Sequence, residues 1–542
     1  MLLSALSGIL LWLSWYPIGL TFLSWFAFIP LFLLSDGLSE RNGKYTLWQG
    51  MIYSLPAFLL WNGLTTWWIW NSTPPGSIAA IFLNSLFMAI VFGLWHMFRK
   101  NKWHPAITAV MFIAFWCSWE FLHLHWDISW PWLNLGNVFA PHTPLIQWYE
   151  YTGAFGGTIW VLAANFLFYA FIGYYRKSRK KAWTYLAIFG TWIIIPIGIS
   201  LIIYYSYTPS DKNPVDAVIV QQNTDPWKEQ YAMNNTEHTI RLLEVARPQI
   251  DRNTELIICP ESAIPHTVSS TLLLENSYPL DEVNYYGFVL LDTFFTMFPK
   301  LNIITGLSTF TAFPDKVRPT AREVSPNFFI EMYNSSACIN REGVTGIYHK
   351  SKLVPGVELM PYPAIFGFLE KLVIDLGGPS GSLGTDSTQH AFTTTIQDHS
   401  IKIGAPVCYE SIYGELFGRF IKDGAQIMCV ITNDSWWKET PGHRQHFIYS
   451  KLRAVETRRT LMRAANTGIS AFIDEKGDVL QQTKYNERIS LKQKVYPNDK
   501  ITFYVKYGDY LARIALFISA GLFLAGLFFI IYNKKRKAKR TA

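Results

Sequence analysis

The amino-acid sequence predicts a multi-span α-helical membrane bundle joined to an extracytoplasmic α/β domain. Half of the 542 residues are apolar and only 16% are charged, against about 25% in an average soluble protein. Long apolar segments gather before residue 210 and again after residue 505, whereas the stretch between them is mixed in character. A membrane part that carries a separate folded domain accounts for this distribution.

Apolar segments near both ends of the chain define the membrane part. Eight of them approach the ~20 residues that cross a ~30 Å hydrocarbon core: 3–19, 21–35, 50–70, 78–98, 106–122, 155–175, 183–205 and 510–532. We expect a membrane domain over residues 1–210 with about seven helices, and a C-terminal transmembrane helix over 508–533. A cleaved signal peptide is disfavoured because no Lys or Arg precedes the first segment and further apolar segments follow it.

Clusters of basic residues indicate the orientation. When the spans alternate, the basic residues near 41–44, 99–102, 176–181 and 534–542 fall on one face, which the positive-inside rule makes cytoplasmic. Residues 534–542 then form a basic cytoplasmic tail, and residues 213–502 lie on the periplasmic side of a bacterial cytoplasmic (inner) membrane. The net charge of +8 thus reflects topology, and we expect no nucleic-acid partner.

Two kinds of function are disfavoured by what the sequence lacks. Glu120 is the main charged residue inside the predicted spans, whereas ion pumps and proton relays need several such groups. The five cysteines show neither paired spacing nor a metal-ligand pattern. We therefore expect no disulfide framework, no metal and no cofactor.

The segment 213–502 alternates apolar, strand-like runs with helical stretches. Strands are expected over 215–221, 255–259, 301–307, 336–340, 401–407 and 427–432, helices near 233–246 and 446–460, and a loop over the Ser-, Thr- and Gly-rich residues 377–395. Strands that alternate with helices predict a sheet covered by helices.

A cysteine lies where one of these strands ends, in Gly404-Ala-Pro-Val-Cys-Tyr-Glu-Ser-Ile-Tyr-Gly414. Cys408 is followed directly by Tyr409 and Glu410, and a nucleophilic thiol needs polar neighbours that assist thiolate formation. Taken alone, these residues favour a buried structural cysteine. The other thiols of the segment, such as Cys259 and Cys429, lie within or at the close of apolar runs.

A carboxylate occupies a similar place in Cys259-Pro-Glu-Ser-Ala-Ile-Pro265. Pro260 ends the preceding strand because it has no N–H to donate, so Glu261 is presented at the edge of the sheet. A carboxylate held there can act as a general base. A solvated loop glutamate is an equally good interpretation of this motif alone.

A third motif is Tyr348-His-Lys-Ser-Lys-Leu-Val-Pro-Gly-Val-Glu-Leu-Met-Pro361. One lysine facing a carboxylate and a thiol would stabilise a developing oxyanion, but the motif does not choose between Lys350 and Lys352, and exposed lysines are the commoner case. A Cys–His pair is a less favoured alternative, for which the candidates are His349, His443 and His446.

Together, the three motifs resemble the Glu-Lys-Cys triad of the nitrilase superfamily. Seven spans before them and one after narrow the resemblance to the membrane-embedded apolipoprotein N-acyltransferase family, and it covers nearly the whole chain. It implies a nitrilase-like α-β-β-α sandwich as the catalytic domain over 213–502. The resemblance continues through Thr432-Asn-Asp-Ser-Trp-Trp437, Arg444-Gln-His-Phe447, Arg453-Ala-Val-Glu-Thr-Arg458 and Arg463-Ala-Ala-Asn-Thr-Gly-Ile-Ser470.

The resemblance implies roles for individual residues. It selects Lys350 over Lys352, which gives Glu261, Lys350 and Cys408 as the catalytic residues, and it implies supporting roles for Glu358, Tyr409 and Glu410. One departure is visible, because the family turn usually reads Val-Pro-Phe-Gly-Glu and this chain has Val354-Pro-Gly-Val-Glu358.

Three tryptophans are further candidates for substrate binding. Trp227 loosely matches an essential tryptophan of the family, and Trp436 and Trp437 could line the entrance for acyl chains. Ordinary interfacial anchoring explains the last two equally well.

The implied reaction transfers an acyl chain from a phospholipid, through a cysteine thioester, to the N-terminal amine of a diacylglyceryl-cysteine apolipoprotein, which completes lipoprotein maturation. Its partners are a phospholipid donor, a lipoprotein acceptor and the lipid bilayer, and we expect a monomer. A membrane-tethered nitrilase-like amidase, in which water replaces the amine, is the alternative. Eight spans favour lipid substrates over soluble amides, and a transporter or scaffold would leave the three motifs unexplained.

Overall fold

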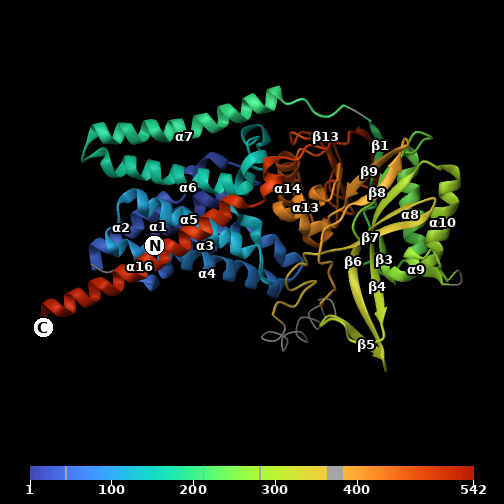
Figure 1. The fold of residues 1–542 in the computed structure, drawn as a ribbon, viewed down its shortest axis with the longest axis horizontal. Coiled ribbons are helices and arrows are strands. Elements are labelled where there is room, and N and C mark those ends of the chain that lie inside the picture. The colour runs from blue at the N-terminus through green and yellow to red at the C-terminus, as the bar shows by residue number, and fades with distance from the viewer. Residues whose placement is uncertain (43–44, 212, 280–281, 363–381, 542) are drawn as a thin grey trace. The chain divides into compact units, whose positions relative to one another are not determined.

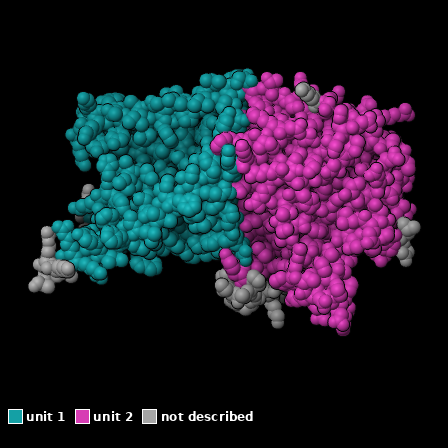
Figure 2. Space-filling view, viewed as in Figure 1, with its two compact units in different colours: residues 1–70, 74–206, 507–542 teal, residues 71–73, 207–506 magenta. Residues whose placement is uncertain are grey.

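The protein is described from a computed structural model that covers the chain except residues 43–44, 212, 280–281, 363–381 and 542. The chain divides into two compact units (Figure 2). One comprises Met1–Trp70, Pro74–Ser206 and Tyr507–Ala542, and the other comprises Asn71–Thr73 and Tyr207–Lys506.

The first unit is helical, and each predicted apolar segment contains a helix. The main helices are α1 (Leu2–Ser14), α2 (Ile29–Asn42), α3 (Leu47–Thr66), α4 (Pro74–Phe98), α5 (Pro105–His123), α6 (Tyr149–Tyr175), α7 (Arg179–Ser206) and α16 (Tyr510–Thr541). Within the described residues, six helical segments are long and apolar enough to cross a membrane: Thr21–Ser39, Pro74–Asn101, Pro105–His123, Tyr149–Tyr175, Arg179–Ser206 and Tyr510–Arg536.

The other two helices of this unit differ from the expected spans. Helix α1 ends at Ser14 rather than near residue 19 and has 13 residues, which at 1.5 Å per residue is about 20 Å and short of a full span. Helix α3 has 20 residues but includes polar side chains such as Gln49 and Asn62, and is absent from the six.

Small residues and internal hydrogen bonds hold this bundle together. Helices α3 and α4 approach closely at two glycines, since a Cβ on Gly50 would lie 2.6 Å from the Cα of Gly93; such small residues let backbones pack in membranes. The carboxylate of Glu120 accepts hydrogen bonds from Trp116 Nε1 at 3.0 Å, from the Leu135 N–H at 2.7 Å and from Thr158 Oγ1 at 2.7 Å. This carboxylate is therefore tied into the bundle by three donors.

The second unit contains two sheets. In the described residues the first sheet has eight strands in the order β14-β1-β2-β4-β6-β5, with β3 beside β4 and β7 beside β6. Its strands are β1 (Val215–Gln221), β2 (Leu256–Ile258), β3 (Ile264–Ser269), β4 (Asn302–Phe313), β5 (Arg322–Ser325), β6 (Phe328–Asn340), β7 (Gly343–His349) and β14 (Ile489–Val495).

The second sheet has six described strands in the order β13-β12-β11-β10-β9-β8. They are β8 (Phe392–Ile396), β9 (His399–Gly404), β10 (Ile427–Thr432), β11 (Leu461–Ala465), β12 (Ala471–Ile473) and β13 (Val479–Gln482). Side chains join the two sheets, because Ser336 Oγ on β6 donates to the Ala405 carbonyl oxygen at 3.0 Å.

Helices cover the outer faces of both sheets (Figure 1). Helices α8 (Asn235–Ala246) and α10 (Val283–Met297) lie against the first sheet, and α13 (Gly414–Lys422) and α14 (Pro441–Thr457) lie against the second. Two further short helices among the described residues are α9 (Ser270–Leu274) and α15 (Phe503–Tyr507). This arrangement confirms the predicted α-β-β-α sandwich.

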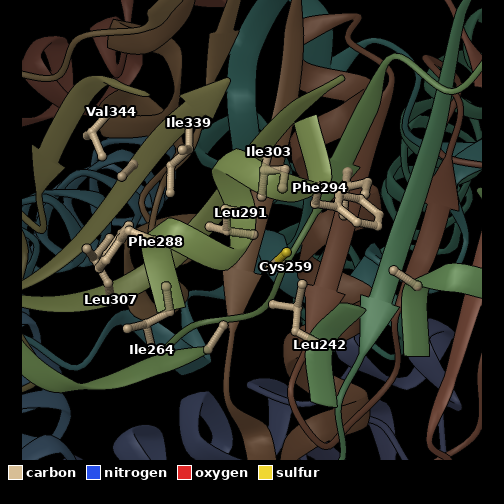
Figure 3. Close-up of a cluster of buried hydrophobic side chains, with 14 of the residues drawn as sticks. Leu242, Cys259, Ile264, Phe288, Leu291, Phe294, Ile303, Leu307, Ile339 and Val344 are labelled. Atoms are coloured by element: carbon tan, nitrogen blue, oxygen red, sulfur yellow. The ribbon is translucent and has the colours of Figure 1, made fainter. Parts of the chain in front are cut away.

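The core beneath α8 and α10 shows why these segments fold as they do (Figure 3). Leu242 of α8 and Leu291 and Phe294 of α10 pack with Ile303 of β4 and Ile339 of β6, and each of these side chains is buried. Cys259 lies in the same cluster. Apolar residues at helical spacing thus bury one face of each helix on the sheet.

The structure corrects two expected segments. Residues 392–396 belong to the predicted loop 377–395 or follow it, yet they form β8, in which Phe392 pairs with Ile403 of β9; residues 377–381 lie outside the described residues. The helix expected over 446–460 begins at Pro441, after the Thr440 cap, and ends at Thr457, because Arg458 is left-handed with φ +50°.

Candidate active site

The sheet topology brings Glu261 and Lys350 to the same edge. Strand β2 is parallel to β4, and β7 is antiparallel to β6, which is itself antiparallel to β4. Strands β2 and β7 therefore run in the same direction, and each ends just before its candidate residue. Cys408 follows β9, which is parallel to β10 in the other sheet.

Cys408 is the first residue of a short 3-10 turn, Cys408–Ile412, and has a left-handed backbone with φ +52°. For a residue other than glycine this conformation costs about 1–3 kcal/mol, and such strain gathers at functional sites. Burial raises the pKa of the Cys408 thiol, and the nearby Glu261 carboxylate raises it further, while Lys350 opposes both effects. The thiol therefore keeps its proton at neutral pH.

The carboxylate of Glu261 lies close to that thiol, since each group affects the pKa of the other. Its Oε1 accepts from Asn334 Nδ2 at 2.8 Å and its Oε2 accepts from the Asn433 backbone N–H at 2.8 Å, while the Cys408 side chain lowers its pKa. Burial raises the pKa of Glu261, although Lys350 opposes this. A basic oxygen fixed by two protein donors and facing an S–H group has the arrangement of a general base.

Lys350 supplies the positive charge at this edge. Its Nζ lies 2.9 Å from both carboxylate oxygens of Glu358 and 3.7 Å from Glu261 Oε1, and only 1% of its side chain is exposed. Burial lowers the pKa of Lys350, but the carboxylates of Glu358 and Glu261 outweigh it and hold the pKa above its usual value. The ammonium group stays charged and can stabilise a nearby anion.

The turn that departs from the family pattern still delivers Glu358 to Lys350. The N–H of Val354 donates to Glu358 Oε2 at 2.9 Å, and Gly356 takes the left-handed conformation with φ +74° that the turn requires. The Nδ2 group of Asn334, which holds Glu261, also donates to Glu358 Oε1 at 2.9 Å. Pro-Gly-Val therefore closes the turn with the carboxylate facing inward.

Glu410 joins the cysteine turn to the loop after Lys350. Its Oε2 accepts from the Val407 N–H at 2.8 Å, while its Oε1 accepts from the Ser351 N–H at 2.8 Å, Ser351 Oγ at 2.7 Å and the Tyr348 hydroxyl at 2.5 Å. Burial raises its pKa, and these donors oppose the rise. The carboxylate thus holds two segments of backbone in register.

Tyr409 and the three tryptophans differ in burial and in their ring contacts. Tyr409 is buried, and its ring meets Tyr413 edge-on at 5.3 Å. Trp227 is 61% exposed and meets Trp436 edge-on, with the ring centres 5.1 Å apart. Trp437 lies 5.6 Å from the His446 ring.

The alternative thiols, the second lysine and His349 have other surroundings. Cys259 and Cys429 are fully buried, and the Lys352 ammonium lies 5.1 Å from the centre of the Tyr413 ring. His349 stacks on Tyr333.

The other two histidines also have defined places. His443 packs against Tyr485, with 4.6 Å between the ring centres. His446 Nε2 lies 3.3 Å from the backbone carbonyl oxygen of Cys408.

Two residues of the site were missed by the sequence reasoning. Asn433 lies within the motif Thr432-Asn-Asp-Ser-Trp-Trp437, directly after a strand. That position alone could have marked it as a residue of the site. Asn334 lies inside β6 and outside the motifs shared with the family, so only the structure shows that it bridges Glu261 and Glu358.

Two family models match the chain. Residues 7–167 match the apolipoprotein N-acyltransferase N-terminal domain, and residues 217–493 match the carbon-nitrogen hydrolase family. Among solved structures, Saccharomyces cerevisiae Nit3 of the nitrilase superfamily aligns at 16% identity with a TM-score of 0.36, over 54% of this chain and 93% of that one.

Curated relatives extend over nearly the full length. The apolipoprotein N-acyltransferase of Chlorobaculum tepidum is 29% identical and aligns with 96% of this chain and 95% of its own length. The apolipoprotein N-acyltransferase of Geobacter metallireducens is 25% identical and aligns with 94% of this chain and 92% of its own length. The chain therefore belongs to the apolipoprotein N-acyltransferase family of membrane enzymes, with a catalytic domain of the carbon-nitrogen hydrolase type.

Proposed function

We propose that this acyltransferase acylates lipoproteins through a thioester on Cys408, with a phospholipid as the donor and the amine of a diacylglyceryl-cysteine lipoprotein as the acceptor. The observation that carries the proposal is the Lys350 ammonium 3.7 Å from the Glu261 carboxylate, with the buried Cys408 thiol close enough for both groups to act on its pKa. These are the base, nucleophile and cation that two-step acyl transfer needs.

In the first step the thiol proton passes to Glu261 as sulfur attacks the sn-1 ester carbonyl of the phospholipid. Lys350 stabilises the oxyanion of the tetrahedral intermediate. When the intermediate collapses, the ester C–O bond breaks and Glu261 returns the proton to the departing oxygen. The products are a lysophospholipid and an acyl thioester on Cys408.

In the second step the lipoprotein amine attacks the thioester carbonyl. Glu261 takes a proton from the amine, a C–N bond forms, and the C–S bond breaks. That proton restores the Cys408 thiol, and the N-acylated lipoprotein leaves. The scheme predicts ping-pong kinetics because the first product departs before the second substrate reacts.

Supporting residues hold these groups in place. Glu358 and Asn334 fix Lys350 and Glu261, Glu410 fixes the two loops, and Tyr409 packs beside the nucleophile. We assign the exposed Trp227 and the half-buried Trp436 and Trp437 to contacts with acyl chains. Burial of each CH₂ group in the bilayer is favourable by about 0.8 kcal/mol, so both lipid substrates remain membrane-bound and the enzyme must meet them there.

The basic loops support a periplasmic catalytic unit in the cytoplasmic membrane of a bacterium, and we propose a monomer as the working form. Lipoproteins acquire their lipid on that side of the membrane in this scheme, so substrate and site share one compartment.

Intact-protein mass spectrometry tests the nucleophile. After incubation with phospholipid alone, the protein should gain the mass of one acyl group, and addition of a diacylated lipopeptide should remove it. Cys408→Ala should gain no acyl group, whereas Cys429→Ala, which changes a fully buried core thiol, should still be acylated. Acylation of Cys408→Ala would refute the assignment, and release of ammonia from small amides at comparable rates would favour the amidase.

A further inference from the structure

Behind the Cys408 turn lies a chain of buried polar side chains that the proposed mechanism does not use. It consists of Ser411, His446, Asp434 and Arg463, all with side chains fully removed from solvent. We call these four residues the Asp434 brace. They come from the cysteine turn, from α14, from the turn after β10 and from β11.

One end of the brace holds the backbone of the nucleophile. Ser411 Oγ donates to the carbonyl oxygen of Cys408 at 2.7 Å. His446 Nε2 lies 2.9 Å from Ser411 Oγ and 3.3 Å from the same carbonyl oxygen. Two side chains therefore meet one backbone oxygen of Cys408.

The other end of the brace is anchored by charge. Asp434 Oδ1 lies 3.0 Å from His446 Nδ1, and Asp434 Oδ2 accepts from Arg463 at 2.7 Å. Arg463 is held in turn, since its Nε donates to the Ile469 carbonyl oxygen at 3.2 Å and it lies 3.3 Å from Ser450 Oγ. A buried ion pair with its remaining donors satisfied is a rigid support.

The Cys408 turn needs such a support. A left-handed cysteine costs about 1–3 kcal/mol relative to relaxed backbone, so the turn persists only where its surroundings fix it. Because the peptide group is planar, holding the carbonyl oxygen fixes the plane between Cys408 and Tyr409. That plane limits the backbone angles of Cys408 and hence the direction of its Cα–Cβ bond.

We propose that Asp434, acting through His446 and Ser411, is a positioning residue that keeps the Cys408 thiol directed at Glu261 during acyl transfer. The inference rests on the proposed function of Cys408. It differs from an ordinary packing role, because it requires the brace to control thiol reactivity in a protein that remains folded.

The test compares two buried serines. Ser411→Ala removes the hydroxyl that reaches Cys408, whereas the matched control Ser490→Ala removes a buried hydroxyl of β14 that donates to the Val245 carbonyl oxygen at 2.7 Å and lies outside the brace. We expect Ser411→Ala to lower the rate of acyl-enzyme formation about 100-fold, the cost of misplacing a reacting group by about 1 Å, with KM for phospholipid unchanged. Ser411→Thr, which keeps a hydroxyl, should recover most of the rate, and Ser490→Ala should stay close to the native rate.

Alkylation of Cys408 by iodoacetamide, followed in the peptide that contains it, gives a second readout. Ser411→Ala should change the pH dependence of this reaction, because the thiol no longer faces Glu261. Thermal unfolding verifies that each variant is folded. If Ser411→Ala does not fold, His446→Asn serves instead, since asparagine keeps a polar group beside Asp434 but cannot reach Ser411.

Equal rates and equal alkylation profiles for folded Ser411→Ala and Ser490→Ala would overturn the inference. Cys408→Ala separates this outcome from failure of the proposed function. If Cys408→Ala is inactive while Ser411→Ala is normal, only the positioning role is wrong. If Cys408→Ala still forms the acyl-enzyme, the nucleophile itself is wrong.

Discussion

Asn334 donates from a single Nδ2 group to Glu261 Oε1 at 2.8 Å and to Glu358 Oε1 at 2.9 Å. One amide thereby spaces the buried carboxylate of Glu261 and the partly buried carboxylate of Glu358, which also share the Lys350 ammonium. Its position inside β6 makes that spacing rigid.

Asn334→Asp should disable the base while preserving shape. A third carboxylate would repel Glu261 and raise its pKa further, so Glu261 would hold a proton at neutral pH. Acyl-enzyme formation should fall about 100-fold or more, within the usual contribution of a general base, and should partly recover as the pH rises. Asn340→Asp, nearer the end of the same strand, is the control, and equal loss in both variants would contradict this role.

Glu410→Gln should both destabilise the protein and slow it. The amide places a donor where the carboxylate accepts the Val407 N–H, and losing a buried charged acceptor costs about 3 kcal/mol. The melting temperature in detergent and the acylation rate should therefore fall together. Glu342→Gln, at an exposed turn, should change neither the melting temperature nor the rate. A Glu410→Gln variant with native stability would show that the hydrogen bonds of the Glu410 carboxylate are unimportant.

Replacement of Cys408 should reverse the usual ranking of alanine and glycine. At φ +52° alanine is strained and glycine is not, so Cys408→Gly should be more stable than Cys408→Ala by about 1 kcal/mol. At Ala454, inside α14, glycine should instead be the less stable residue by a similar amount. Denaturant or thermal unfolding of the three variants measures these stability differences. A Cys408→Ala variant that is as stable as Cys408→Gly, or more stable, would rule out a left-handed cysteine.

Stability should fall below neutral pH through His446. Burial, followed by the charge of Arg463, lowers its pKa below the usual 6.5. Between the lowered pKa and 6.5 the unfolded chain binds the proton and the folded chain does not, so the free energy of unfolding rises with pH through this window. The part of the free energy of unfolding that neutral His446 contributes is lost as the pH falls through this window.

Melting temperatures at pH 5.5 and 7.5 measure this effect. The native protein should melt lower at pH 5.5, and His446→Asn should show a smaller difference between the two. An unchanged difference would mean that other histidines, such as His238 with its similarly lowered pKa, account for the dependence.

The sequence was sufficient for the architecture because its signals are local. Apolar length marks the membrane helices, and Pro260 and the polar residues after β9 mark strand ends, where side chains become available for chemistry. The departure at Val354-Pro-Gly-Val-Glu358 could not be judged this way, since its outcome depends on contacts with Lys350 and Asn334.

Residues that act across the fold were beyond the reach of local patterns. Glu410 lies next to the nucleophile in sequence, yet its carboxylate binds backbone and hydroxyl groups of the lysine loop. Asn334 has no motif of its own, and Ser411 and Asp434 are linked only when α14 brings His446 between them. Such roles depend on tertiary register, which one-dimensional spacing does not encode.

The residues of the Asp434 brace are spread along the chain from Ser411 to Arg463 and so are synthesised at different times. Glu261 and Lys350 are synthesised before Cys408. The hydrogen bonds between Glu410 and Ser351 need only residues up to the cysteine turn. Arg463 follows later, on a strand that must still pair in parallel beside β10. A chain that stops before that strand lacks Arg463, so the brace that we propose for the thiol would be incomplete in it.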